Sequence, residues 1–169
     1  MKAFKPEIVK LKDRTVLTVT SVGDPNKVAQ EYIKALDGTA YGAKFKFFKS
    51  KGKKMEIGLL VAQWPDAHIK PKNKWTGVWG LEVSSFVKNN DLLQKNPKIL
   101  AKIEKWKYGT VAQILYKGPY SEVKATISQL YKFINDKGYR IAGSYEEEYL
   151  TRPTVKVPKI IIRHKVIKK

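Results

Sequence analysis

The segment Ser144–Pro153 carries the residues best suited to ligand chemistry. Its alternation predicts a β-strand, on which Tyr145, Glu147 and Tyr149 share one face. A carboxylate with a tyrosine two residues away on each side would lie among aromatic rings, which suits an apolar or cationic ligand. The alternative is an exposed edge strand whose acids pair with nearby lysines. The pattern alone leaves both interpretations open.

The overall charge is the second clue to function. The chain has 34 Lys and Arg against 15 Asp and Glu, a net charge of +19 that would attract nucleic acid, an anionic membrane surface or acidic partners. Lysines alternate with core-type residues at Lys44–Lys49, which favours a solvated strand face over a binding patch. A lysine-rich proteome would give the same count. A nucleic-acid-binding protein is the competing hypothesis, with Phe45, Phe47 and Phe48 as a stacking surface.

Several classes of site are not indicated. The chain has no cysteine, and His68 and His164 lack the ligand company of a metal site. No phosphate-binding glycine loop or nucleophile elbow occurs, so no metal and no other cofactor is expected. The N-terminus lacks the apolar run of a signal peptide, and no apolar run approaches the ~18 residues of a membrane span. A cytoplasmic protein is expected.

The first half predicts a strand, a helix and further strands. After a short leading strand within residues 1–13, strands are expected at Thr15–Val22, Lys44–Lys49, Met55–Trp64 and Trp75–Val87. The helix should begin with Asp24 as N-cap and Pro25 in the first turn, and end at Gly38. Gly77 and Gly80, inside the last strand, indicate a bulge or a close approach by another group.

A middle helix is expected within Asn89–Lys107, beginning near Asn96. The segment Thr110–Gly118 then aligns without a gap with Thr15–Gly23, which indicates an internal repeat. At the same offset a second helix should bury an apolar stripe made of Val123, Ile127, Leu130, Tyr131 and Ile134. Strands are expected to follow at Tyr139–Ala142, around Glu147 and at Lys159–Ile167.

The repeat predicts an α+β fold of two repeated β-α-β-β modules, with pseudo-two-fold symmetry around a central ligand cleft. The expected organisation is one domain over residues 1–169, with module one at about 14–88, a connecting helix at about 89–108 and module two at about 109–167. Equivalent strands and loops would converge at the axis. Trp64, Trp75 and Trp79 are candidate cleft walls, and Trp79, near two glycines, is the first choice.

Four motifs occur in order in the second half: Gln113–Glu122, Leu130–Tyr139, Glu147–Leu150 and Ile160–Val166. Through them the chain resembles the GyrI-like small-molecule-binding family, which is related to effector-binding domains of multidrug-responsive transcription regulators. The first half resembles the family's amino-terminal module through Val22-Gly23, Gly58-Leu59 and Trp64. That family's fold is two β-α-β-β modules around a cleft, in agreement with the repeat.

The resemblance implies roles for individual residues. In the family, a glutamate at the base of the cleft faces lipophilic, often cationic, ligands, and Glu147 matches it, followed by Tyr149. Tyr120 matches the aromatic residue of the family's Gly-Pro-Tyr turn. Some members resemble hydrolases that open cyclopropane rings in DNA-alkylating natural products. Those members commonly carry histidines where Tyr145, Glu146 and Tyr116 stand here. This departure favours binding over hydrolysis.

We therefore expect a stand-alone domain that binds lipophilic small molecules, which can be cationic. No DNA-binding helix-turn-helix fits within residues 1–13. The expected ligand-binding residues are Glu147, Tyr149, Tyr145, Tyr116, Tyr120, Trp79 and Trp64. The first alternative is a hydrolase of cyclopropane-bearing alkylators, in which Glu147 positions or deprotonates water. The second alternative is a basic nucleic-acid-binding protein.

Overall fold

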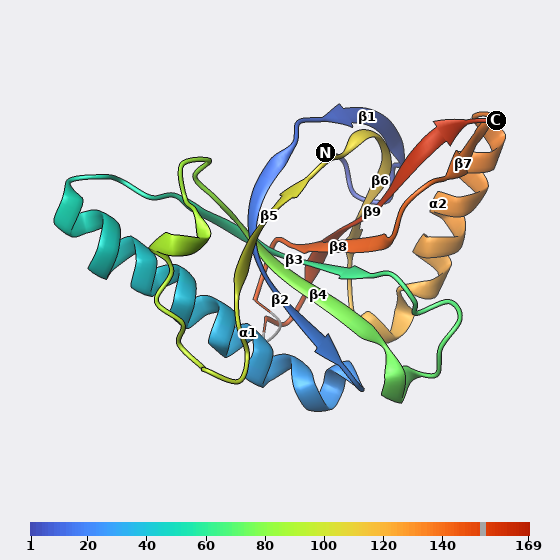
Figure 1. The fold of residues 1–169 in the computed structure, drawn as a ribbon. Helices are drawn as coiled ribbons and strands as arrows, with labels where there is room; N and C mark the ends of the chain where they lie inside the picture. Colours follow the sequence, from blue (N-terminus) through green and yellow to red (C-terminus); the bar gives the residue numbers. More distant parts are fainter. Residues whose placement is uncertain (153–154) are drawn as a thin grey trace. The chain divides into compact units, whose positions relative to one another are not determined.

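The computed structural model of the protein describes residues 1–152 and 155–169 (Figure 1). Pro153, the last residue of the predicted site segment, lies outside them. Within the described residues, antiparallel strands are combined with two α-helices, which confirms the predicted α+β class. The chain forms two compact units: unit 1 contains residues 1–12 and 108–169, and unit 2 contains residues 13–107.

Unit 2 is built on an antiparallel sheet. Its strands are β2 (Arg14–Val22), β3 (Ile57–Trp64), β4 (Thr76–Val83) and β5 (Lys102–Trp106), paired in the order β3-β4-β2-β5. The strands predicted at Thr15–Val22, Met55–Trp64 and Trp75–Val87 are thereby confirmed. The inward-facing residues are largely β-branched or aliphatic, which is the composition that a half-buried pleated surface favours.

The helix of unit 2, α1 (Pro25–Gly42), packs against β2 and β4 and buries Leu36 completely. Its start is as predicted, because the carboxylate of Asp24 accepts a hydrogen bond from the backbone two residues further on. Its predicted end at Gly38 is wrong. A Cβ at Gly38 would lie 2.4 Å from Cγ of Lys95, so this glycine allows a close approach within a continuing helix.

The strand predicted at Lys44–Lys49 is also wrong. The chain continues from α1 into a π-helical turn at Ala43–Phe48 and a 3-10 turn at Lys49–Lys51. Phe48 is 3% exposed and meets Phe86 edge to face, with ring centroids 5.1 Å apart. The aromatic and lysine residues of this segment fit a helical period as well as a period of two, and packing in unit 2 selects the helix.

The middle helix predicted within Asn89–Lys107 is likewise not formed. A 3-10 turn at Asn89–Asp91 is followed by irregular chain and then by β5. Side chains hold this irregular chain: Asn89 Oδ1 accepts from the backbone N–H of Ile103 (2.7 Å), and Gln94 exchanges two hydrogen bonds with the backbone of Ala101 (2.8 and 2.9 Å). These amides satisfy backbone groups that a helix would have paired.

Unit 1 likewise consists of antiparallel strands and one α-helix. Its elements are β1 (Glu7–Leu11), β6 (Gly109–Lys117), α2 (Lys124–Asp136), β7 (Tyr139–Ile141), β8 (Tyr145–Tyr149) and β9 (Lys159–Lys168). The sheet order is β1-β6-β9-β8, and β7 pairs with the C-terminal part of β9. The predicted leading strand, second helix and late strands are confirmed.

The core of unit 1 lies between α2 and the sheet. Its buried residues are Ala112, Ile114, Tyr116, Leu130, Ile134, Ile160, Ile162 and Val166. Full burial of one such aliphatic side chain contributes about 1.5–3 kcal/mol, so this cluster fixes α2 on the sheet. The stripe predicted for α2 is right at Leu130 and Ile134 but wrong at Tyr131, which is 41% exposed at the border of the stripe.

Among the residues that the structure describes, no helix has the length and apolar character needed to cross a membrane.

Candidate functional site

Strand β8 positions the central residues of the candidate site. It pairs antiparallel with β9, and Glu147 lies opposite Ile162. Burial alternates along the strand: Glu146 is 2% exposed and Glu148 is 9% exposed on one face. Tyr145 and Tyr149 are half-buried on the other face, against the core beneath α2. The predicted strand and its two faces are confirmed. The alternative of an exposed strand with solvent-facing acids is wrong for Glu146 and Glu148, which are buried.

Glu147 lies among tyrosine hydroxyl groups. Tyr149 donates a hydrogen bond to Glu147 Oε1 (3.3 Å), and Tyr145 is hydrogen bonded to the same carboxylate. Burial raises the pKa of the Tyr145 and Tyr149 hydroxyls, and the negative charge of Glu147 raises both further. The two phenols therefore stay protonated at neutral pH and act as donors to the carboxylate.

Tyr120 belongs to the same cluster. It begins the 3-10 turn Tyr120–Glu122 that precedes α2, and it is 38% exposed. Partial burial raises the pKa of its hydroxyl, and the charge of Glu147 adds to this effect. Glu147 with Tyr120, Tyr145 and Tyr149 is named here the tyrosine cluster.

Tyr116 lies in unit 1 with a different set of contacts. Its ring is 4% exposed and meets Phe4 edge to face at 5.9 Å, and its hydroxyl donates to the backbone carbonyl of Pro119. These contacts fix the turn that carries Tyr120. A direct ligand contact by Tyr116 stays a prediction.

Trp64 and Trp79 lie in unit 2. They are 7% and 4% exposed and pack edge to face with ring centroids 5.1 Å apart. Trp79 donates its indole N–H to Ser21 Oγ at 2.9 Å. The close approach predicted at Gly77 is confirmed, since a Cβ there would lie 3.0 Å from the Trp64 ring. The two tryptophans thus form packing of unit 2, and their role as ligand contacts stays a prediction.

His164 borders the tyrosine cluster, and sequence reasoning gave it no role. It is 4% exposed on β9, and its ring lies 5.7 Å from that of Tyr145 and 5.4 Å from that of Tyr131. Nδ1 faces the carbonyl of Gly143 at 3.1 Å, which can only accept, so Nδ1 carries a proton. In the neutral ring Nε2 then accepts from the Tyr131 hydroxyl at 3.1 Å.

A buried ion pair on the opposite face holds β8 in place. Arg163 donates to Glu146 Oε2 (2.7 Å) and to Gln113 Oε1 (2.9 Å), and Tyr108 donates to Glu146 Oε1 (2.9 Å). Arg163 lies opposite Glu146 in the pairing of β8 with β9. The ion pair between Arg163 and Glu146 follows from the register of β8 with β9, which the sequence alone does not reveal.

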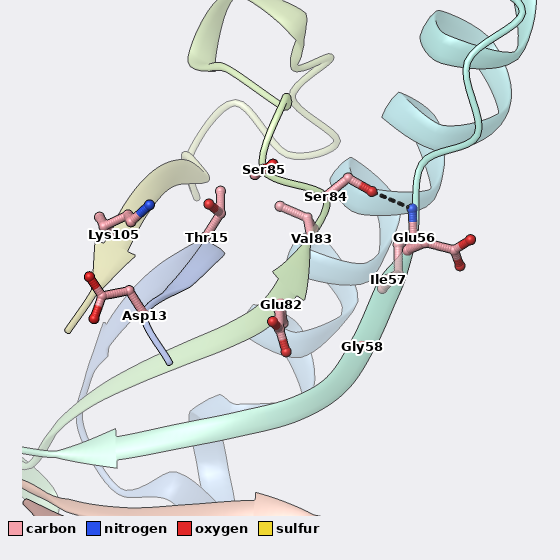
Figure 2. A pocket seen from close by; sticks show the side chains of 10 residues that line it. All are labelled: Asp13, Thr15, Glu56, Ile57, Gly58, Glu82, Val83, Ser84, Ser85 and Lys105. Atoms are coloured by element: carbon pink, nitrogen blue, oxygen red, sulfur yellow. Dashed lines mark hydrogen bonds between the residues drawn. The ribbon is translucent and has the colours of Figure 1, made fainter. Parts of the chain in front are cut away.

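A separate pocket of about 440 Å³ lies in unit 2 (Figure 2). It contains none of the predicted site residues, and its lining combines acidic and hydroxyl side chains with the aliphatic side chains of Ile57 and Val83. Lys105 lies at one side. Its acids have cationic neighbours, because Glu82 lies 3.7 Å from Arg14 and Glu56 lies 3.5 Å from Lys54. Without aromatic walls, this pocket does not match the ring-lined site that the sequence predicts.

Comparison of the sequence with known protein families identifies one family. A sequence model of the GyrI-like small molecule binding domain matches residues 4–167. A search of curated protein sequences finds no match.

Three solved structures are similar over nearly their whole length. A hydrolase from Listeria innocua shares 23% identity at a TM-score of 0.79, covering 99% of this chain and 94% of that chain. An uncharacterized conserved protein from Listeria innocua shares 23% identity at a TM-score of 0.83, covering 98% and 93%. The EcmrR C-terminal domain shares 15% identity at a TM-score of 0.69, covering 98% of each chain. These likenesses establish the fold.

Proposed function

The chain belongs to the family of GyrI-like small molecule binding domains, and on that premise we propose that it binds lipophilic cations at the tyrosine cluster. The resemblance first indicated by motifs in the second half is confirmed, and the family match extends over residues 4–167. The proposal concerns the kind of ligand and the residues that hold it.

The observation that carries the proposal is the environment of Glu147. Hydroxyl groups of Tyr145 and Tyr149 donate to its carboxylate, and Tyr120 lies within electrostatic reach. Glu147 is half-buried, and its carboxylate and the neighbouring phenol rings lie in one small region of unit 1. A cationic ligand would be attracted both by the charge of the carboxylate and by the faces of the phenol rings.

The expected energetics follow from these two contributions. Each tyrosine face would add cation–π attraction of about 0.5–2 kcal/mol, and a hydrogen bond or contact to a charged group contributes about 1.5–3 kcal/mol. A neutral ligand of the same shape would keep the apolar contacts but not the charge-dependent ones. Glu147 should therefore distinguish cationic from neutral ligands.

We predict that Glu147→Gln weakens binding of N-methylquinolinium by about tenfold or more, while binding of neutral 1-methylnaphthalene changes less than about twofold. The amide keeps the shape of the side chain and one acceptor oxygen but removes the charge. Dissociation constants for both ligands can be measured by fluorescence titration.

The matched control is Glu31→Gln, which removes the same charge from an exposed position on α1. It should leave both affinities unchanged. Equal losses for the cationic and the neutral ligand in Glu147→Gln would contradict the role of Glu147 as a charged anchor.

The element order of the two units supports the proposal that they are copies of one module. In unit 2, β2 pairs with β4 and β4 with β3; in unit 1, β6 pairs with β9 and β9 with β8. Trp64 and Trp79, which the sequence predicts as ligand contacts, stay proposed contacts that a separate measurement must test. Quenching of tryptophan fluorescence by the bound cation, reduced in Trp79→Phe, would support that contact.

The second candidate function is hydrolysis at the same glutamate. One support is the hydrogen bond between the Tyr145 hydroxyl and the Glu147 carboxylate, which places a proton donor beside a possible general base. The other support is the fold that the chain shares with a hydrolase from Listeria innocua. In such a step the oxygen of water would form a bond to one cyclopropane carbon while a ring C–C bond of the alkylator breaks. The electron pair of that bond would pass to the conjugated group of the alkylator, which would take up one proton of the water by way of Glu147.

We rank binding first and predict no enzyme-dependent water addition when a cyclopropane-bearing alkylator is incubated with the protein. Mass spectrometry resolves the hydrated product directly, and buffer without protein gives the background. A product that forms with the native chain and is lost in Glu147→Gln would reverse the ranking.

A further inference from the structure

The segment of residues 41–54, which ends α1 and leads toward β3, concentrates positive charge. It contains six lysines and no acidic residue. The lysines are Lys44, Lys46, Lys49, Lys51, Lys53 and Lys54. Lys54 lies 3.5 Å from Glu56, but both side chains are largely exposed, so this pair neutralises little. We call residues 41–54 the basic surface.

Two aromatic rings stand exposed on the basic surface. Phe45 is 55% exposed and Tyr41, one helical turn earlier, is 47% exposed. Their rings are nearly parallel, with an interplanar angle of 16° and centroids 6.1 Å apart. The ammonium group of Lys44 lies 5.5 Å from the centroid of Phe45. Flat aromatic faces and cationic groups are therefore presented side by side.

The rest of the segment anchors this surface. Phe48 is buried against Phe86, and Phe47 meets Phe48 edge to face at 4.9 Å. The ammonium group of Lys51 lies 4.2 Å from the centroid of Phe47. The competing nucleic-acid hypothesis had three phenylalanines as a stacking surface; of these, Phe45 is exposed and Phe48 lies in the core.

A pocket of about 310 Å³ opens between these groups. One of its lining residues is Met55, an apolar side chain that is 1% exposed. Its remaining lining residues are Lys44, Phe45, Lys49, Gly52, Lys53 and Lys54. A planar, negatively charged ligand would find an apolar side chain, one aromatic face and several ammonium groups within the same space.

We propose that the basic surface binds single-stranded nucleic acid, with phosphates held by its lysines and a base stacked on the Phe45 and Tyr41 rings. Lysine-lined grooves with aromatic platforms are the means by which single strands are bound without sequence preference. Bases inside a duplex do not offer their faces, so a single strand fits better. A membrane-binding helix needs a broad apolar face, whereas this segment offers two exposed rings among six lysines.

This surface shares no residue with the tyrosine cluster, since its residues belong to unit 2 and Glu147 belongs to unit 1. Binding of nucleic acid here would give the chain a second activity. Loss of either one by mutation should leave the other intact.

The test is fluorescence anisotropy with a labelled single-stranded DNA of about 12 nucleotides, measured over a series of salt concentrations. For a single strand, the slope of log affinity against log salt is about −0.7 for each phosphate contacted. A triple variant in which glutamine replaces Lys44, Lys49 and Lys53 should therefore reduce the slope by about 2 and weaken binding at low salt.

The matched control replaces Lys27, Lys72 and Lys74 by glutamine. These lysines are exposed in the same unit, and Lys27 lies near the opposite end of α1. The control removes the same charge and should retain most of the affinity and slope. Equal effects of the two triple variants would show attraction by overall charge alone and would overturn the proposal.

A second variant tests the stacking contact separately. Phe45→Leu keeps an apolar side chain of an exposed residue, so the fold should be retained, but it removes the aromatic face. Affinity should fall by about fivefold or more with the salt slope unchanged. Unchanged affinity in Phe45→Leu would overturn the stacked-base contact.

Binding to lipid vesicles tests whether the basic surface recognises an anionic membrane instead of nucleic acid. Sedimentation with phosphatidylcholine vesicles, with and without phosphatidylserine, should show no binding that depends on Lys44, Lys49 and Lys53. Vesicle binding that the triple variant abolishes, without binding of the oligonucleotide, would assign the surface to a membrane and overturn the proposal.

Discussion

Glu146 and Glu147 are adjacent in sequence but have different chemical environments. Glu146 is 2% exposed and accepts hydrogen bonds from Arg163 and Tyr108. Glu147, on the other face of β8, accepts from Tyr149. A strand turns successive side chains to opposite faces, so one step along the chain separates a structural ion pair from a candidate ligand anchor.

This contrast predicts opposite mutational profiles. Glu146→Ala leaves the buried guanidinium of Arg163 without its close partner, and removal of one member of a buried pair costs about 3–5 kcal/mol. Glu148 lies 3.8 Å from Arg163 and still offers it a negative charge. The loss of stability in Glu146→Ala should therefore lie near the lower end of that range. Glu147→Gln should change the free energy of unfolding by less than about 1 kcal/mol.

Urea denaturation followed by circular dichroism measures both changes. A destabilisation in Glu147→Gln as large as that in Glu146→Ala would show that Glu147 is also a structural residue. Its proposed role in binding would then need a variant that keeps the fold.

At the residue scale, the sequence predicts groups that lie on one strand but not groups that meet across strands. Tyr145, Glu147 and Tyr149 were identifiable because a period of two places them on one face. The contacts of Arg163 and His164 depend on the register of β8 with β9 and on the placement of α2. That information arises only when the sheet and helix have assembled.

At the element scale, two glycines illustrate opposite roles. A Cβ at Gly80 of β4 would lie 2.6 Å from Cγ1 of Val16 and 3.0 Å from the Trp106 ring, both in the core of unit 2. A Cβ at Gly42, the last residue of α1, would meet nothing within 4 Å. Gly80 is therefore needed for the close packing of Val16 and Trp106. Gly42 has no such role, and its backbone freedom in the unfolded chain lowers the stability of the helix.

We predict that Gly80→Ala lowers the free energy of unfolding by about 1–3 kcal/mol, because the added methyl group overfills the sheet face. Gly42→Ala should raise it by about 0.5–1 kcal/mol, because alanine favours the helical backbone already present. Thermal and urea denaturation of the two variants checks both signs. Stabilisation by Gly80→Ala would mean that Val16 and Trp106 can move apart freely.

The elements that sequence reasoning misassigned share a physical cause. At Lys44–Lys49 the spacing of the apolar residues fits both a strand and a helix. The burial of Phe48 in the core of unit 2 favours the helical conformation. Within Asn89–Lys107 the residues Ile99, Ile103 and Trp106 have helical spacing, but side-chain amides bond to the backbone and the end of the segment forms β5. Tertiary packing and local side-chain hydrogen bonds overrode the period in both places.

At the scale of the whole molecule, the sequence gives the net charge of +19 but not its distribution. Several acids are used in short ion pairs, including Asp136 with Lys132 and Glu104 with Lys102. Lysines of the basic surface gather instead where α1 ends. Salt should screen attraction at this exposed surface much more than it affects contacts at the half-buried tyrosine cluster.

Unit 1 is assembled from both ends of the chain. Strand β1 pairs with β6 along Glu7–Leu11, Gln113 donates to Glu7 at 2.9 Å, and Phe4 packs on Tyr116. Residues 13–107, the whole of unit 2, lie between these partners in sequence. During synthesis the N-terminal arm leaves the ribosome first and must wait for its partner strand. Until then the growing polypeptide carries an unpaired strand edge, which nascent-chain chaperones are placed to shield.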